Sequence, residues 1–493
     1  MFNLNMSIFN NISKYGLLAK LIHWLTAAGL LIQIPLGFYL VDLDFDQTRV
    51  DIENYHILFG LILFYTTLIR LTFKLLSPTP NFNDNAFPGQ KVLAKLNHFF
   101  LYLALLTITI SGIFKKLFNG EYYDLYGWEK PAWFNKENIT EELSYSRNNI
   151  HSIIQKECEH VSEHVGIIDL STFSKYEIKG EDSFAFLDRL CSNSIPKKNG
   201  SIALTHIHNK IGRIQSELTI TKVKDNHYYG LSAALSEIRD LDWFNQNKLK
   251  NEKVDIKNIT NEYGVLGLIG PKSREVLAKT TKENIENENF PWLKAKEIEI
   301  NNIKVLALRV NYMGELGWEL HVSMNKMEEL YDLLMDAGQN LKIINFGSHA
   351  MNSMRMEKGY RGWGTELTPE ISIVEAGLDR FFNLDKKSEF IGSKVIEKKL
   401  KEGIKIKLVY LEVDANIADV LGNEPVYHNN ERVGLTTSGA YGFRVNKSLA
   451  FAYVNSNLVK AGTEFLIDIQ GQKIKSKIIE EPAFDPKNLR LKS

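Results

Sequence analysis

The chain has 493 residues, a length typical of two to four domains. Its 59 basic and 59 acidic side chains give a net charge of zero, which removes the electrostatic argument for a nucleic-acid partner. Its two cysteines, Cys158 and Cys191, are too few for a disulfide framework and lack the spacing of zinc ligands.

Three long apolar runs dominate the N-terminal part, at Leu21–Leu40, about Tyr55–Leu76 and about Leu93–Phe114. Each has about the 20 residues that the hydrocarbon core of a bilayer requires. One such run is also typical of a signal peptide or a buried core helix. Three in succession, with no A-x-A cleavage site after the first, favour membrane spans. The sequence therefore predicts a multi-pass protein with three transmembrane helices and a lipid bilayer around them.

The charges beside these runs predict their orientation. The loop at residues 41–54 is acidic apart from Arg49, whereas basic residues precede the first run and fill the second connection. The positive-inside rule then places the N-terminus and the second connection in the cytoplasm. Three spans put the following body outside, although Lys115 and Lys116 disagree with that side. The basic residues that set the orientation are Lys14, Lys20, Arg70, Lys74, Lys91 and Lys95.

Each of the three runs carries a histidine close to one end: His23, His56 and His98. An ionisable side chain within a span is rare and suggests a function. Imidazole is also the usual axial ligand of b-type haem iron. The alternative for each is an interfacial histidine near a helix end, but three together favour haem.

The rest of the chain alternates short β-like runs with helical patterns. Strands are predicted at 174–182, 201–209, 212–223 and 227–233, and helices at 183–193, 273–289 and 326–340. From about Lys405, short strands with glycine turns follow one another regularly, which indicates a small barrel. The predicted fold is therefore multi-domain: a helical transmembrane domain at 1–116, a linker at 117–146, an α+β domain at 147–404 and a β-barrel at 405–493.

Three segments of the α+β domain combine acidic and aromatic side chains, while G-x-G-x-x-G, Walker A and H-E-x-x-H motifs are absent from the sequence. Carboxylates beside aromatic rings suit a flat, nitrogen-rich heterocycle, because rings stack and carboxylates accept N–H donors. Taken singly, each residue is more simply a surface carboxylate or a core aromatic. The residues are Glu217; Tyr312, Glu315, Trp318 and Glu319; and Arg355, Glu357, Tyr360 and Trp363.

The N-terminal strings AKLIHWLTAAGLLI, YHILFGLILFYTTLIRL and LNHFFLYLALLTITISG resemble the first three helices of bacterial cytochrome b561 and of the nickel–iron hydrogenase cytochrome b. The resemblance covers about residues 14–113. It implies a bacterial inner-membrane protein linked to quinone, with haem b held by His23, His56 and His98. The family's fourth helix has no counterpart here, so both haems lose an axial ligand. His23 and His98 could share one iron, which leaves an iron at His56 without a second axial histidine from this chain.

The region from about 121 to 493 resembles the folate-dependent half of dimethylglycine and sarcosine dehydrogenases, which is similar to the aminomethyltransferase (T-protein) of the glycine cleavage system. Matching strings include GRIQSELTITKV, YMGELGWELHV, MRMEKGYRGWGTEL and VGLTTSGAYGFRVNKSLAFAYV. The resemblance implies a tetrahydrofolate site and a T-protein-like fold. It also implies folate-dependent one-carbon transfer.

The resemblance assigns roles residue by residue. The paired aspartates of T-proteins fall on Ser216 and Glu217, and Glu217 is the candidate catalytic base. Tyr312 and Glu319 fall on folate-contacting positions, with Glu319 as the pterin anchor. We expect Glu217, Tyr312 and Glu319 to line one pocket. Two arginines, Arg355 and Arg380, are further candidate contacts, although relatives often have an aromatic residue at the second position; Met351 replaces an arginine of the T-proteins.

Two classes of function follow from these resemblances. One is a membrane-anchored, tetrahydrofolate-dependent one-carbon transferase that receives its substrate from a separate flavoprotein dehydrogenase, since the flavin domain of the dehydrogenases has no counterpart here. The other is a non-enzymatic membrane electron carrier whose folate-like body is a docking scaffold. A fusion of two partial genes is a third interpretation. The predicted outside location of the body conflicts with the cytoplasmic location of reduced folates.

Overall fold

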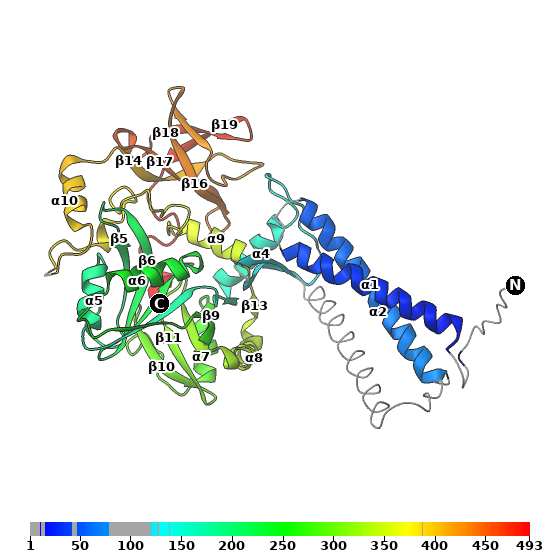
Figure 1. Ribbon diagram of the computed structural model, residues 1–493. Coiled ribbons are helices and arrows are strands. Elements are labelled where there is room, and N and C mark those ends of the chain that lie inside the picture. Colours follow the sequence, from blue (N-terminus) through cyan, green and yellow to red (C-terminus); the bar gives the residue numbers. More distant parts are fainter. Residues whose placement is uncertain are drawn as a thin grey trace. The chain divides into compact units, whose positions relative to one another are not determined.

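The computed structural model describes residues 10, 15–41, 47–77, 120–125, 128–137, 139–386 and 388–493 (Figure 1). The chain divides into two compact units, Met1–Asn119 and Gly120–Ser493. The third predicted span and His98 lie outside the described residues.

The first unit contains two long helices, α1 (Leu17–Val41) and α2 (Gln47–Leu76). Glycines lie where they meet: a Cβ at Gly29 would lie 2.7 Å from Leu63 Cδ1, and one at Gly37 would lie 3.2 Å from His56 Cε1. Because the partner numbers fall as the α1 numbers rise, the helices are antiparallel. Small residues at such contacts let two helix backbones approach closely, as membrane helices do.

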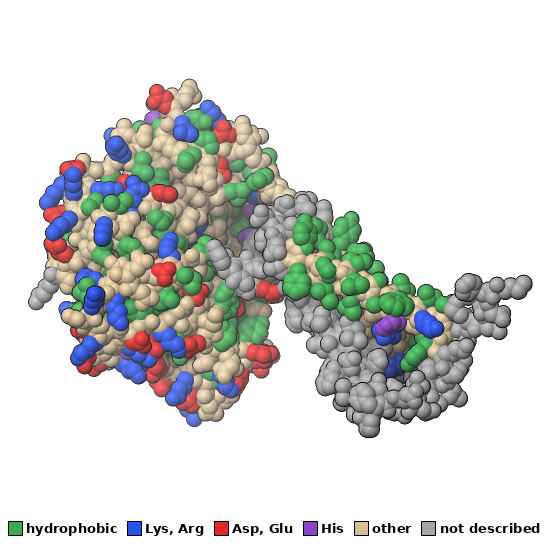
Figure 2. Space-filling model, viewed as in Figure 1, with side chains coloured by type: hydrophobic (Ala, Val, Ile, Leu, Met, Phe, Trp, Pro, Cys, Tyr) green, Lys and Arg blue, Asp and Glu red, His purple; other side chains and the backbone are tan. Residues whose placement is uncertain are grey.

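Apolar side chains on α1 are exposed, among them Trp24 at 69%, Leu31 at 77% and Phe38 at 72%. Figure 2 shows hydrophobic side chains spread over the visible surface of this hairpin. Of the helices in the described part of the chain, α1 alone has the length and apolar composition to cross a membrane, over Leu17–Tyr39. The second predicted span forms as α2, which begins earlier than expected. The predicted count of three transmembrane helices is therefore not confirmed.

The second unit begins with a hairpin of β1 (Gly120–Leu125) and β2 (Trp128–Phe134), within the segment that we expected to be a linker. Glu157 of helix α4 (His151–Glu163) connects this hairpin to the domain. Its carboxylate accepts hydrogen bonds from the Phe134 N–H at 2.6 Å and from the Gly347 N–H at 3.0 Å. The hairpin was missed because alternation in β2 is weak: Pro131, Ala132 and Trp133 are all buried.

A six-stranded sheet, ordered β10-β11-β12-β9-β3-β13, forms the centre of the α+β domain (Figure 1). Its neighbours are antiparallel except β13 and β3. One face packs on α7 and α8 and the other on α4 and α9. The strands are β3 (Val165–Asp169), β9 (Tyr263–Ile269), β10 (Ala295–Ile300), β11 (Ile303–Leu308), β12 (Gly317–Ser323) and β13 (Ile343–Asn345), and the helices are α7 (Ser273–Thr280), α8 (Met327–Gly338) and α9 (Ser348–Glu357).

A five-stranded antiparallel sheet, ordered β5-β6-β7-β4-β8, packs one face against α5 and α6. Its opposite face meets the six-stranded sheet, where Tyr229 and Leu231 pack with Ala295 and Leu308. We call these two facing surfaces the intersheet faces. The strands are β4 (Ser174–Lys179), β5 (Ile202–His208), β6 (Ile214–Lys224), β7 (His227–Ser232) and β8 (Asp255–Asn258), and the helices are α5 (Ser183–Leu190) and α6 (Glu237–Asn247).

The C-terminal part is a closed barrel, ordered β14-β17-β16-β15-β18-β19, which alternating apolar residues fill. This confirms the predicted α+β domain followed by a barrel that starts near residue 405. The strands are β14 (Ile406–Val413), β15 (Pro425–His428), β16 (Glu431–Gly442), β17 (Lys447–Asn455), β18 (Glu464–Ile469) and β19 (Gln472–Ile478), and α10 (Ser393–Glu402) and α11 (Leu489–Lys492) flank them.

Most predicted elements of the second unit are present, but the predicted helix at 273–289 ends at Thr280. Beyond it, the side chain of Asn284 accepts a hydrogen bond from the Glu286 N–H at 3.0 Å. Asparagine side chains that bind nearby backbone in this way compete with helical hydrogen bonds. The composition of residues 281–289 favours a helix, but this turn ends the helix before them.

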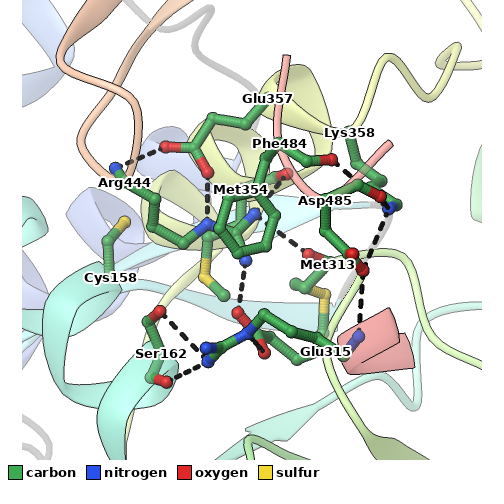
Figure 3. Close-up of polar contacts among 12 residues, drawn as sticks. Cys158, Ser162, Met313, Glu315, Met354, Glu357, Lys358, Arg444, Phe484 and Asp485 are labelled. Carbon is green, nitrogen blue, oxygen red and sulfur yellow. Dashed lines mark hydrogen bonds and ion pairs between the residues drawn. The ribbon is translucent and has the colours of Figure 1, made fainter. Parts of the chain in front are cut away.

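Arg444, in the turn between β16 and β17, joins the barrel to the α+β domain (Figure 3). Its guanidinium bonds Glu315 Oε1 at 2.7 Å and also bonds Glu357, and all three side chains are buried. It donates to the backbone oxygens of Met313 at 3.0 Å and Met354 at 2.9 Å. One barrel side chain therefore holds both the loop before β12 and the end of α9.

Further charges complete this buried network in Figure 3. Arg490 donates to the second oxygen of Glu315 at 2.7 Å, and Lys358 pairs with Asp485 at 3.5 Å. The ring of Phe484 lies 3.8 Å from the Arg444 guanidinium carbon. Each buried charge therefore has a partner, as burial of charge requires.

We predict that Arg444→Met lowers the free energy of unfolding by about 3 kcal/mol, because two buried carboxylates lose their shared cation. Chemical denaturation of the detergent-purified chain, followed by tryptophan fluorescence, measures the change. Lys394→Met is the matched control, because Lys394 and Glu389 are 79% and 72% exposed in their 3.2 Å pair. Equal midpoints for the two variants would show that the network does not hold the barrel in place.

Candidate functional site

The alternation of β6 decides where Glu217 points. Leu218 and Ile220 lie in the core beneath α5 and α6. Glu217 directly precedes Leu218, and successive side chains of a strand point to opposite faces, so Glu217 faces the other side of the sheet. Its ladder partner on β5 is His206, whose Nε2 lies 3.3 Å from Glu217 Oε1. The Glu217 side chain is 25% exposed, whereas His206 is fully buried. The carboxylate is thus accessible on the intersheet face.

Ser216 points the other way, into the core beneath α6. Its hydroxyl donates to Asp240 Oδ2 at 2.6 Å, and both residues are buried. Burial raises the pKa of Asp240 above its usual value. Of the two adjacent positions, Glu217 alone therefore presents its side chain to the intersheet face.

Glu319 lies on the intersheet face of the six-stranded sheet. On β12, Trp318 and Leu320 belong to the core under α7 and α8, so Glu319 and His321 face the other side. His321 Nε2 lies 3.7 Å from Glu319 Oε2, and the Glu319 side chain is 16% exposed. A second half-buried carboxylate therefore faces the same interior as Glu217.

The hydroxyl of Tyr229, on β7, connects the two sheets. It lies 3.0 Å from Nδ1 of His321, and both residues are buried. Burial lowers the pKa of His321, so the ring is neutral at physiological pH. Burial also raises the pKa of Tyr229, and the charge of Glu319 adds to the rise. This contact fixes the β12 carboxylate relative to the five-stranded sheet.

Tyr312 comes from the loop between β11 and β12. Its ring stacks on Tyr360 with centroids 5.8 Å apart, and its hydroxyl donates to the Arg361 carbonyl oxygen at 2.5 Å. Burial raises the pKa of the Tyr312 hydroxyl, and the Glu217 carboxylate adds to this rise. Tyr312 and Glu217, far apart in sequence, therefore act on one another electrostatically.

Arg355 is buried behind this loop, in α9. Its guanidinium donates to Asn352 at 2.9 Å, to the Tyr360 carbonyl at 3.0 Å, to Glu366 at 3.1 Å and to Ser438 at 2.9 Å. These four hydrogen bonds bind it to protein acceptors. The structure thus gives Arg355 the geometry of a support for the loop that carries Tyr360.

Arg380 is exposed on the short 3-10 helix η5 (Asp379–Phe381). Its guanidinium carbon lies 5.3 Å from the centroid of the Phe381 ring. That ring lies 6.2 Å from the ring of His206, edge to face. Arg380 therefore lies at the border of the site, on the side of His206 and Glu217.

Four further residues shape this site and were not predicted from the sequence: His206, Tyr229, Asp240 and His321. A signal existed for His206, because His206 and His208 alternate on a predicted strand directly before the strand of Glu217. The contacts of Asp240 and Tyr229 depend on residues 24 and 92 positions away, which local patterns do not reveal.

The haem candidates of the described residues lie far apart. His23 lies on α1, with its ring 5.6 Å from that of Trp24, and His56 on α2 packs against Gly37. Fourteen residues separate His23 from Gly37, which is about 21 Å along a helix. One iron cannot bind both histidines, and the described residues contain no cluster of three or more candidate metal ligands. Within the described residues the haem site is therefore incomplete.

Three protein families match the chain, and two of the matches overlap at residues 115–153. Residues 115–386 match the GCVT N-terminal domain, and residues 407–485 match the glycine cleavage T-protein C-terminal barrel domain. Residues 14–153 match the prokaryotic cytochrome b561 family.

Individual proteins give the same result for the second unit. Human mitochondrial dimethylglycine dehydrogenase is 38% identical over 380 residues, which are 76% of this chain and 44% of that protein. The aminomethyltransferase of Thermoanaerobacter sp. (strain X514) is 30% identical over 367 residues, which are 74% of this chain and 94% of that protein. This chain thus spans less than half the length of the dehydrogenase.

A solved structure shows the same fold. The glycine cleavage system aminomethyltransferase T from Bartonella henselae superposes with a TM-score of 0.66 at 20% identity, and covers 76% of this chain and 97% of that one. At this identity the likeness establishes the fold of the second unit and nothing further.

We predict that Asp240→Asn becomes increasingly stable relative to the parent as pH rises from 4 to 7. The pKa of Asp240 is raised in the folded state. Its contribution to the free energy of unfolding is therefore fully present below the pKa of the unfolded state, and it is lost as pH rises through the pKa of the folded state. Asparagine retains an acceptor for Ser216 and carries no charge. Unfolding free energies of both proteins across this range measure the difference; a difference that shrinks with pH would contradict the prediction.

Proposed function

Because the chain belongs to the glycine cleavage T-protein family, we propose that its second unit catalyses one-carbon transfer to tetrahydrofolate. The match covers both the GCVT N-terminal domain and the C-terminal barrel domain. Relatives of the second unit include an aminomethyltransferase and dimethylglycine dehydrogenases. The proposed substrate is therefore an aminomethyl or methylene donor related to N-methylated glycine.

The observation that carries this proposal is the pair of accessible carboxylates on the intersheet faces. Glu217 and Glu319 come from different sheets and keep 25% and 16% of their side chains exposed. The ring of Tyr312 lies in the same region. A pterin offers an aromatic face and several N–H donors, which such an arrangement suits.

Bound tetrahydrofolate would supply the nucleophilic nitrogen that takes up the one-carbon unit. As the new N–C bond forms, the C=N π bond of the iminium substrate breaks and its electron pair returns to the substrate nitrogen. Glu217 would accept, on a carboxylate oxygen, the proton that the folate nitrogen loses. Glu319 would accept hydrogen bonds from the pterin, and Tyr312 would hold its ring. Arg355 supports the loop beneath Tyr360. These assignments extend the expectations for Glu217, Tyr312 and Glu319 with the geometry described above.

We also propose that the first unit anchors this transferase in a bacterial inner membrane as a multi-pass segment. The match to prokaryotic cytochrome b561 and the exposed apolar side chains of α1 support this location. The iminium substrate would come from a separate flavoprotein dehydrogenase, and quinone is the proposed electron acceptor of the membrane segment. The second candidate function, an electron carrier with the folate-like body as scaffold, rests on the same cytochrome match.

We predict that Glu217→Ala lowers tetrahydrofolate-dependent consumption of formaldehyde by at least about a hundredfold, as loss of a general base does. The rate without protein is subtracted. The free energy of unfolding should change little, because the side chain is partly exposed.

Glu177→Ala is the matched control for this variant. Glu177 lies on β4 of the same sheet, is 26% exposed and pairs with His227 at 3.0 Å. It should keep the parent rate. Equal losses in both variants would attribute the effect to the sheet rather than to Glu217.

We predict at most one haem b per chain. His23 and His98 are the one pair of histidines that we expect to share an iron, because His23 and His56 lie too far apart to do so. An iron at His56 would then need a second axial ligand from outside these three histidines. Haem is measured by pyridine haemochromogen against protein concentration in the parent, His23→Ala and His56→Ala. A stoichiometry near two that falls stepwise in the variants would contradict this prediction. It would also favour the electron-carrier function and a further subunit that supplies ligands.

A further inference from the structure

His206 is a fully buried histidine. Within the described residues neither ring nitrogen has a hydrogen-bond partner, although Nε2 lies 3.3 Å from Glu217 Oε1. A buried polar group left unsatisfied destabilises the folded state, so it requires an explanation. The Glu217 oxygen, 3.3 Å away, is close enough to accept a hydrogen bond from Nε2. An apolar side chain at this position would leave no polar atom unsatisfied.

The surroundings of His206 leave Glu217 as its natural partner. On its own strand, the equally buried His208 has a pKa lowered to about 3, first by burial and then by His206. His208 is therefore neutral. On the opposite side, η5 places the Phe381 ring edge-on to His206, and the charged residues of that turn are Asp379 and Arg380. The Arg380 guanidinium carbon lies 5.3 Å from the centroid of the Phe381 ring. On the side of β12, the buried Tyr312 hydroxyl interacts electrostatically with Glu217.

We propose that His206 is a positioning residue for Glu217, an inference that rests on the proposed folate-dependent transfer. His206 carries a proton on Nε2 and donates it in a hydrogen bond to Glu217 Oε1 when ligand covers the intersheet face. This bond stabilises the ionised carboxylate and aims its other oxygen at the reacting nitrogen. The imidazole keeps its proton throughout, so it takes no part in the bond-making step.

Three substitutions distinguish the effect of the His206 N–H donor from the effect of its ring. His206→Phe keeps a ring against Phe381 and removes the donor. His206→Gln keeps an N–H near the position of Nε2. His208→Phe is the matched control, because His208 is equally buried on the same strand but its ring lies by Phe390, at 5.8 Å.

The pH dependence of kcat tests the proposal. Loss of the donor makes the carboxylate easier to protonate, so the acid limb of the profile should move to higher pH. We expect His206→Phe to move it by about one pH unit, a tenfold loss of kcat on the acid side, as loss of a hydrogen bond to the charged form implies. KM for tetrahydrofolate should change less than twofold. His206→Gln should restore the parent profile, and His208→Phe should keep it.

A binding measurement gives a second readout that does not depend on turnover. Calorimetric titration with 5-formyltetrahydrofolate at pH 6, in two buffers of different ionisation enthalpy, reports the protons taken up on binding. The parent should take up almost none, because His206 keeps Glu217 ionised. His206→Phe should take up a larger fraction of one proton per chain. If this variant does not fold, His206→Asn, which places no donor at the position of Nε2, replaces it in both experiments.

The outcomes distinguish the two levels of the proposal. A parent protein that neither binds 5-formyltetrahydrofolate nor turns over would refute the proposed function itself. If the parent is active but has the same acid limb and the same proton uptake as His206→Phe, the positioning role of His206 is overturned and the proposed function stands. A loss of rate that His206→Gln does not restore, at an unchanged acid limb, would make His206 a packing residue only.

Discussion

The buried ion pairs of Arg444 are the constraint on which the geometry of the second unit depends. This side chain projects from a barrel turn and bonds Glu315 before β12 and Glu357 at the end of α9. A displaced barrel would leave two carboxylates buried without their cation, which is costly in a region of low dielectric. The network therefore fixes the loop of Tyr312 and the start of β12, and with them the direction of Glu319.

The second determinant is the two-residue period of β6 and β12. On each strand, alternate residues fill a core beneath helices, so the residues between them face the other sheet. This places Glu217 and Glu319 on facing surfaces without any special loop. Ser216, where the resemblance implied one member of a paired-aspartate motif, instead bonds Asp240 in the core. A single carboxylate at this place therefore carries the proposed proton transfer.

Local patterns in the sequence predicted four strands of the five-stranded sheet and the barrel, because alternation and glycine turns are local properties. They also placed Glu217, Tyr312 and Glu319 in notable segments. They could not predict the partners of those residues: the contact of Tyr229 with His321 joins strands 92 positions apart. The hairpin at 120–134 was missed because three adjacent residues of β2 are buried, and the haem ligands could not be paired because pairing depends on how helices pack.

The central claim is that both sheets contribute to one folate site. Hydrogen–deuterium exchange of the full chain in detergent, with and without 5-formyltetrahydrofolate, tests it most directly. The account predicts that ligand slows exchange together in residues 214–221 and 312–321, while the outer helix α5 exchanges as before. Protection of only one of these two segments, or protection confined to another part of the second unit, would contradict the account.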